Sequence, residues 1–286
     1  MENKRKMRAR KSRAVIWFIT LAMLAGGIGL YTLTREREPS YQGKSLRTWL
    51  SQTGTTRIFP VGDDPVELAV RQMGTNAIPS LLEMLKRKSD SPFATKILDL
   101  SERFHALRYI FAPKQAWQEN ELAVKGFYCL GTVASNAAPE LIRIYHENIS
   151  DSSRSCALES FCYVSPASSK DLLSDALTNT NGNLRYVALQ LIPTNQPDFA
   201  VPHLIKMLGD ESADIQGQAA FKLIKFGTNS LPAVPELVKL ACSAPTNYLS
   251  ELGAWNAAAI ALGKLDPQTA AKVLTNAYWA NKKDED

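Results

Sequence analysis

Residues 66–85 read Val-Glu-Leu-Ala-Val-Arg-Gln-Met-Gly-Thr-Asn-Ala-Ile-Pro-Ser-Leu-Leu-Glu-Met-Leu, and part of this stretch returns twice further along the chain. Residues 130–143 read Leu-Gly-Thr-Val-Ala-Ser-Asn-Ala-Ala-Pro-Glu-Leu-Ile-Arg, and residues 226–239 read Phe-Gly-Thr-Asn-Ser-Leu-Pro-Ala-Val-Pro-Glu-Leu-Val-Lys. Each copy places Gly-Thr before an Asn, a small residue and a Pro. Three copies of this order are difficult to attribute to chance, so they indicate an internal repeat.

Weaker copies fill the gaps between these three. Leucines that mark the beginning of corresponding second helices are spaced 31, 32 and 33 residues apart: Leu141, Leu172, Leu204 and Leu237. Small residues occupy matching places in the first helices: Ala157, Ala188 and Ala220. A final unit contains residues 256–263 and a predicted helix over 268–280. A period in the low thirties with two helical patterns predicts an all-α fold, an α-solenoid of about five to six helical hairpins over residues 66–280. A polar tail, 281–286, follows.

The physical chemistry of one unit explains the pattern. In the first helix of the unit around 218–240, apolar residues recur at helical spacing: Ala219, Phe221, Leu223, Ile224 and Phe226. The Gly that follows can adopt the left-handed conformation that ends a helix. Pro232 or Pro235 suits the first turn of the second helix, where a missing N–H costs nothing. No unit buries its own apolar face, so we expect the stack to fold as one domain.

The turns at 74–79, 131–139 and 227–235, with the helices on each side, resemble those of HEAT-like repeat proteins. The order of an uncharged stretch at 14–34, then Tyr41-Gln-Gly-Lys-Ser-Leu-Arg-Thr-Trp-Leu50, then the repeats, also resembles uncharacterised membrane-anchored HEAT-repeat proteins of planctomycete and verrucomicrobial bacteria. The resemblance implies a helical array that binds a partner, and it transfers no contact residues. Two departures stand out: residues 86–119 form an insertion with a plausible helix over 93–111, and Ser165-Pro166 replaces one Gly-Thr turn.

The N-terminus predicts a membrane anchor. Residues 14–34 carry no charge, and this length crosses a hydrocarbon core of about 30 Å as one transmembrane helix. Residues 1–13 form a basic tail with seven Lys and Arg, which favours a cytoplasmic N-terminus and an extracytoplasmic repeat domain, on the periplasmic side if the source is bacterial. A cleaved signal sequence with a site near Ala25-Gly26-Gly27 is the alternative.

Residues 35–65 read as a juxtamembrane linker with a capping helix. Ser45 suits the N-cap of a short helix whose apolar edge is Leu46, Trp49 and Leu50. A helix of this length cannot stand alone, so we expect it to cover the open end of the repeats.

Charge and cysteine content exclude several classes of function. The chain has a formal net charge of +5, but residues 1–34 hold seven basic residues and one acidic residue, so residues 35–286 carry −1. This balance argues against a nucleic-acid partner. The four cysteines read as buried thiols, although one disulfide, first of all Cys129 with Cys162, stays open. The three histidines show no ligand spacing, so we expect no metal and no cofactor.

We found no nucleophile–base set, paired carboxylates or phosphate loop that would indicate catalysis. The sequence therefore favours a non-enzymatic scaffold for a protein or peptide partner, and a HEAT-like enzyme accessory or lyase-type protein acting on an exported substrate is the alternative. We expect the second helices to line a concave face. Its exposed row, of mixed charge, would be Glu83, Lys86, Glu140, Arg143, His203, Lys206, Glu236 and Lys239.

Overall fold

The computed structural model describes residues 38–52, 64–87, 116–243 and 253–273, and they form a predominantly helical protein, so the predicted all-α class is confirmed. The helices come in pairs. First helices are α3 (Pro65–Met73), α7 (Ala116–Leu130), α9 (Asp151–Val164), α11 (Gly182–Leu191), α13 (Ala213–Ile224) and α15 (Ala254–Leu265). Second helices are α4 (Ile78–Leu85), α8 (Ala138–Glu147), α10 (Lys170–Leu177), α12 (Pro197–Met207) and α14 (Val234–Ala241), and residues 267–273 are helical after α15.

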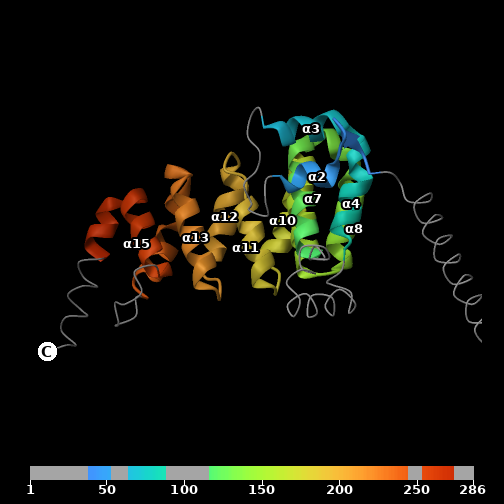
Figure 1. Cartoon of the computed structure of the whole chain (residues 1–286). Coiled ribbons are helices and arrows are strands. Elements are labelled where there is room, and N and C mark those ends of the chain that lie inside the picture. The colour runs from blue at the N-terminus through green and yellow to red at the C-terminus, as the bar shows by residue number, and fades with distance from the viewer. Residues whose placement is uncertain (1–37, 53–63, 88–115, 244–252, 274–286) are drawn as a thin grey trace, which may run out of the picture.

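The pairs form an elongated array that runs from α3 to α15 (Figure 1). Successive first helices contact one another along this whole length. Each second helix also packs on the first helix of the next pair, as α4 does on α7, α8 on α9, α10 on α11, α12 on α13, and α14 on α15. The apolar surface of one pair is therefore buried by its neighbours, which is the arrangement expected when a single pair cannot fold alone.

A glycine with positive φ follows three of the first helices. Gly74, Gly131 and Gly227 have φ of +56°, +52° and +54°. An L-residue with a Cβ pays a steric cost in this region, which explains why the repeat keeps Gly here. Each glycine starts a short 3₁₀ segment: η1 (Gly74–Ala77), η2 (Gly131–Ala137) and η4 (Gly227–Ala233). The helix that follows carries Pro79, Pro139 or Pro235 in its first turn, as predicted.

The N-terminal cap combines a hairpin with a helix. Strands β1 (Ser40–Tyr41) and β2 (Lys44–Ser45) pair antiparallel around Gln42 and Gly43, both of which have positive φ. Helix α2 (Leu46–Ser51) follows, and the Ser45 hydroxyl accepts from the N–H of Thr48, so the predicted N-cap is confirmed. Leu46, Trp49 and Leu50 are all buried, and α2 packs on α3 and α7.

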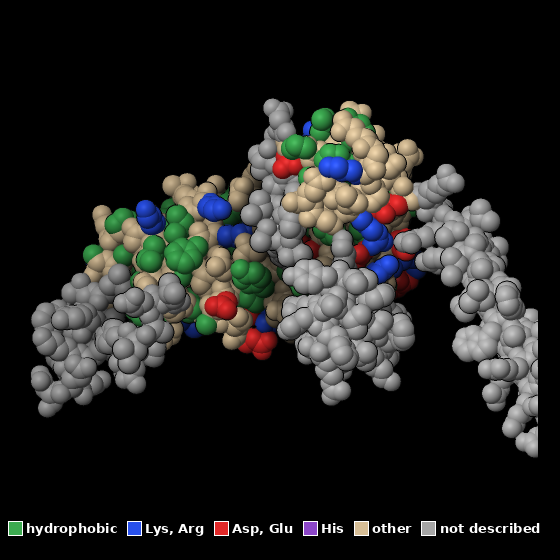
Figure 2. All heavy atoms as spheres, viewed as in Figure 1, with side chains coloured by type: hydrophobic (Ala, Val, Ile, Leu, Met, Phe, Trp, Pro, Cys, Tyr) green, Lys and Arg blue, Asp and Glu red, His purple; other side chains and the backbone are tan. Residues whose placement is uncertain are grey.

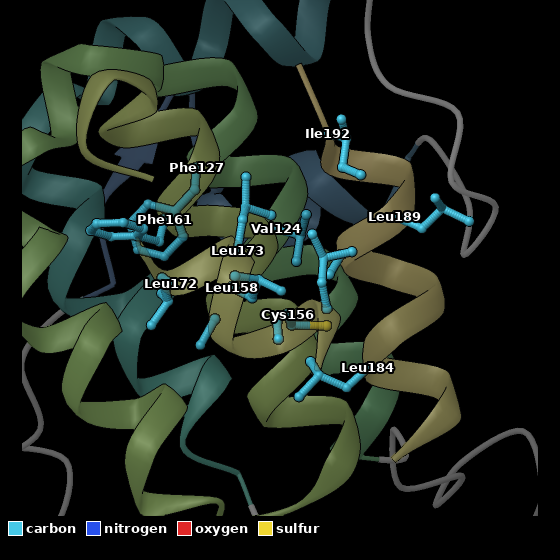
Figure 3. Close-up of a cluster of buried hydrophobic side chains, with 14 of the residues drawn as sticks. Val124, Phe127, Cys156, Leu158, Phe161, Leu172, Leu173, Leu184, Leu189 and Ile192 are labelled. Atoms are coloured by element: carbon cyan, nitrogen blue, oxygen red, sulfur yellow. The ribbon is translucent and has the colours of Figure 1, made fainter. Parts of the chain in front are cut away.

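The core runs through the array between the two layers of helices. In its central part, apolar side chains from four helices converge (Figure 3). Val124 and Phe127 come from α7, and Leu158 and Phe161 from α9, with Leu173 of α10 against them. The predicted small residues of the first helices, Ala157, Ala188 and Ala220, are fully buried, which lets neighbouring helices approach closely.

The structure differs from the sequence interpretation at several boundaries. Residues 116–119 belong to α7, so the insertion does not extend to 119, and α3 begins at Pro65. Leu204 lies in the second half of α12 rather than at its beginning, although it is buried like the other three leucines. Where Ser165 replaces Gly, the chain leaves α9 with φ of −141°, a path that needs no glycine.

Three predictions lie outside the described residues: the transmembrane helix over 14–34, the insertion helix over 93–111 and the end of the helix over 268–280. Within the described ranges, none of the helices combines the length and the apolar character needed to cross a membrane.

Candidate partner-binding surface

The eight residues of the predicted row lie on or directly after second helices. Glu83 and Lys86 lie on α4 and at its C-cap, Glu140 and Arg143 on α8, His203 and Lys206 on α12, and Glu236 and Lys239 on α14. Glu83, Arg143, Lys206 and Lys239 are exposed, and the other four are partly buried. The structure brings some of them together and leaves others apart.

A charged cluster joins α4 to α8. Glu140 forms ion pairs with Lys86 and with Arg143, whose Nε donates to Glu140 Oε2 at 2.7 Å. Arg143 also pairs with Glu147. The hydrogen bond from Arg143 first, and then that from Lys86, lower the pKa of Glu140 to about 2. Glu140 therefore stays ionised at any physiological pH, and three of the predicted contact residues are already paired with one another.

His203 has a structural environment. Its Nδ1 lies 2.7 Å from the carbonyl oxygen of Phe199, and its Nε2 lies 3.2 Å from Ser174 Oγ on α10. A carbonyl can only accept, so Nδ1 is the donor to Phe199, and Nε2 shares the second hydrogen bond with the Ser174 hydroxyl. The imidazole ring also packs against the Phe199 ring, tilted by 37°, with ring centroids 4.5 Å apart. His203 thus holds α12 to α10 rather than presenting a free imidazole.

Lys206 borders a hollow of about 340 Å³ between the α10–α11 and α12–α13 loops, whose floor contains Arg185. Arg185 is 7% exposed and donates through Nε and Nη2 to both carboxylate oxygens of Asp210, at 2.8 and 2.9 Å. Its Nη2 also reaches Glu211 Oε1 at 2.9 Å, and its Nη1 donates to the carbonyls of residues 179 and 180. The hydrogen bonds of this arginine tie two loops of neighbouring pairs.

The electrostatics of the hollow follow from this network. Burial raises the pKa of Asp210, but the hydrogen bonds from Arg185 and from the Ser212 N–H outweigh it, so the net shift is downward. The hydrogen bonds that Arg185 donates to Asp210 in turn raise the pKa of Arg185. The charges of Arg185 and Asp210 at the bottom of the hollow therefore compensate each other. Lys206, at the edge of the hollow, is exposed to solvent. Sequence analysis missed Arg185, because a single Arg in a helix gives no sign of burial.

On α14, Lys239 Nζ lies 3.6 Å from Glu236 Oε2, one turn away on the same helix. Exposed pairs at this spacing contribute little stability and exchange easily with water or a partner. On α14, Lys239 is thus an exposed charge of the row, as Glu83 is on α4, whereas Glu236 is partly buried.

A second hollow, of about 420 Å³, lies on the other layer of the molecule. It is lined by residues of α7, α9 and α11: Glu121, Asp151, Ser152, Ser155, Cys156, Asn183, Tyr186 and Val187. Nothing in the sequence predicted it, because its residues come from three different units.

The cysteines are free thiols, and all four lie in described residues. Cys129 and Cys156 are buried and Cys162 partly buried, as expected, but Cys242 is exposed at the end of α14. Burial raises the pKa of Cys129 and of Cys162 to about 12. In the described ranges, no group of three or more His, Cys, Asp and Glu side chains is placed to hold a metal ion.

Comparison of the chain with protein-family models and with curated proteins finds no match.

Proposed function

We propose that the chain is a membrane-anchored scaffold that binds a protein or peptide partner and performs no catalysis itself. In this proposal the helical pairs form a HEAT-like α-solenoid of about five to six hairpins over 66–280. The anchor is the uncharged stretch 14–34, with residues 1–13 in the cytoplasm and the repeats outside it. The shared Gly turns and the packing of each second helix on the next pair support the solenoid part.

The observation that carries the binding proposal is the mixed-charge row on the second helices. Exposed side chains of this row lie on four different second helices: Glu83, Arg143, Lys206 and Lys239. They include both negative and positive charges. Mixed charges spread over several helices suit a folded or extended polypeptide, whereas a polyanion such as nucleic acid needs one sign.

The existing ion pairs indicate which residues of this row should contribute most to binding a partner. Arg143 is held by two carboxylates, so a partner gains from it only by replacing contacts that already exist. Such exposed pairs are worth about 0–1 kcal/mol, so the exchange is cheap but gives little affinity. Lys206 at the rim of its hollow and Lys239 on α14 are therefore the residues on which we expect binding to depend most.

A capture experiment with a matched control tests this proposal. The full-length chain is immobilised and exposed to solubilised native envelope, and the captured proteins are quantified. We expect the double variant Lys206→Glu/Lys239→Glu to lose the partner, whereas Asp214→Lys, an exposed charge reversal on first helix α13, retains it. Exposed reversals cost under about 0.5 kcal/mol of stability, so loss of fold does not explain the difference.

Equal capture by all three proteins would place the binding surface elsewhere. A partner that emerges chemically altered would instead favour the enzyme-accessory alternative. The orientation has its own test: protease added outside intact spheroplasts should digest the repeats, and full protection of them would reject an extracytoplasmic location.

A further inference from the structure

The first helices share one equivalent outward position. After the first helices the chain turns at Gly74, Gly131, Ser165, Ile192, Gly227 and Asp266. The residues six positions before these are Leu68, Lys125, Glu159, Tyr186, Phe221 and Ile260. On α13, Phe221 lies about 200° around the helix from both Ala219 and Leu223, which are fully buried. This position therefore faces away from the core and from the second helices. In the sequence Phe221 stands among apolar residues at helical spacing, but in the structure its side chain is exposed.

The chemistry of the position changes along the array. Lys125 and Glu159, in α7 and α9, are 2% and 6% exposed, so this part of the layer is covered. Tyr186, Phe221 and Ile260 are 38%, 43% and 43% exposed. They belong to α11, α13 and α15, which contact one another in that order, and we refer to these three residues as the apolar stripe. Hydrophobic side chains gather over the same three helices in the space-filling view (Figure 2).

The molecule itself shows what can cover this layer. Helix α2 packs on first helices α3 and α7, at the other end of the array. Its apolar residues Leu46, Trp49 and Leu50, at helical spacing, are buried there. A charge contact at the side of the interface joins Arg47 of α2 to the buried Glu119 of α7. A short amphipathic helix with a flanking charge thus already packs on two first helices of this chain.

The charged residues beside the apolar stripe indicate which charges a bound helix should carry along its edge. Lys225 and Lys264 follow Phe221 and Ile260 by four residues, so each lies one turn away on the same side of its helix, and both are exposed. Asp214, which is exposed near the start of α13, lies two turns before Phe221, at the opposite edge. The edge formed by the two lysines is therefore basic on two neighbouring helices.

We propose that the apolar stripe docks an amphipathic helix of a protein partner. The helix presents large apolar residues to Tyr186, Phe221 and Ile260 and acidic residues to Lys225 and Lys264. Neighbouring helix axes are about 8–10 Å apart, so three helices span about 16–20 Å between their axes. At about 1.5 Å per residue, a docked helix of three to four turns covers this distance. The stripe lies on the first helices, so this site is separate from the charged row of the second helices.

A displayed library of random 16-residue peptides provides the probe. It is selected on the full-length chain in phosphatidylcholine nanodiscs, with counter-selection on Tyr186→Ser/Phe221→Ser. We expect enriched peptides to carry apolar residues at helical spacing with acidic neighbours. Their dissociation constants, measured by fluorescence anisotropy, should rise at least about tenfold in the double variant. Leu68→Ser is the matched control, because it removes an exposed apolar residue from the same position on α3, outside the stripe.

Exchanging the charges of the chain and of the peptides tests the proposed contacts of Lys225 and Lys264 with acidic residues. Lys225→Glu/Lys264→Glu should weaken the selected acidic peptides and strengthen versions in which their Glu residues are replaced by Lys. Unchanged affinities for both versions, or an enrichment that Tyr186→Ser/Phe221→Ser does not abolish, would overturn the proposal.

Two other occupants are distinguished in parallel. A fluorophore that reports polarity is attached at Gln190→Cys, an exposed position one turn after Tyr186, in a Cys242→Ser background. Blue-shifted emission in anionic nanodiscs without peptide would mean that lipid covers the stripe, and the proposal would be wrong. A dimer that Tyr186→Ser/Phe221→Ser converts to monomer would assign the stripe to a second copy and equally overturn it. Emission that shifts only when peptide is added supports the helix.

Discussion

Replacing Arg185 with Met should destabilise the protein far more than replacing any exposed arginine. Arg185 donates to Asp210 at 2.8 and 2.9 Å, and the side chains of both residues are under 10% exposed. Methionine fills a similar volume but leaves the Asp210 carboxylate buried without its cation. Breaking a buried pair from one side costs about 3–5 kcal/mol, so we expect a loss of this size in the free energy of unfolding.

Arg143→Met is the matched control. Arg143 has as many carboxylate partners as Arg185, but its side chain is 52% exposed, and exposed pairs contribute about 0–1 kcal/mol. Denaturant unfolding of the full-length chain, followed by circular dichroism, measures both variants. Equal losses for the two arginines would refute the reasoning, because burial is the difference on which it depends. Arg185→Met/Asp210→Leu should recover much of the loss, since it removes the stranded charge.

The same pair predicts a pH dependence. Asp210 has a lowered pKa in the folded protein, so its contribution to stability is present above the unfolded pKa of about 3.9 and is lost as the pH falls below that value toward the folded pKa. In Arg185→Met, burial without the cation raises the pKa of Asp210, so acid relieves the penalty. The stability difference between wild type and variant should therefore be full at pH 7, begin to narrow at the raised pKa of Asp210 in the variant, above pH 4, and narrow further toward the lowered pKa of the wild type.

Three further predictions test the fold. Trp49→Ala should lower the free energy of unfolding by about 3–5 kcal/mol, because Trp49 is buried in the cap and donates from Nε1 to the Tyr41 carbonyl at 3.0 Å; an unchanged melting temperature would remove the capping role of α2. Gly131→Ala should cost about 1–2 kcal/mol because φ is +52°, whereas Gly263→Ala, in a helix with open space around it, should be neutral or stabilising in the same melts. Cys242 should react first with iodoacetamide in the native chain, as mass spectrometry of peptides can show, and early labelling of the three other thiols would contradict their burial.

The repeat could be predicted because its turn is a local feature. Gly74, Gly131 and Gly227 need a positive φ that depends on a few neighbouring residues, and the structure gives all three nearly the same φ. The N-cap at Ser45 is equally local and was also predicted. The hairpin around Gln42 and Gly43 was not, because strands of two residues carry no periodic signal.

The outward position of the first helices could not be read from periodicity. These helices carry apolar residues around much of their circumference, since they pack on neighbours at both sides as well as on the second helices. Phe221 therefore looks like a core residue in the sequence, and only the geometry of α13 places it outside. The same limit hid Arg185, whose five donors are satisfied by loops from two different units.

The two layers of helices would therefore contribute to binding in different ways, through ion pairs on the second helices and through apolar burial on the first helices. On the second helices, Lys86, Glu140 and Arg143 already pair with one another, so exchanging those contacts gives selectivity more than affinity. On the first helices, Tyr186, Phe221 and Ile260 are only partly covered, and burying large apolar residues is what usually dominates a protein interface. A partner that needs affinity should therefore depend on the apolar stripe, and one that must be told from close relatives should also reach the charged row. If both proposals hold, charge reversal at Lys206 and Lys239 should change which partner is chosen, and Tyr186→Ser/Phe221→Ser should change how long it stays.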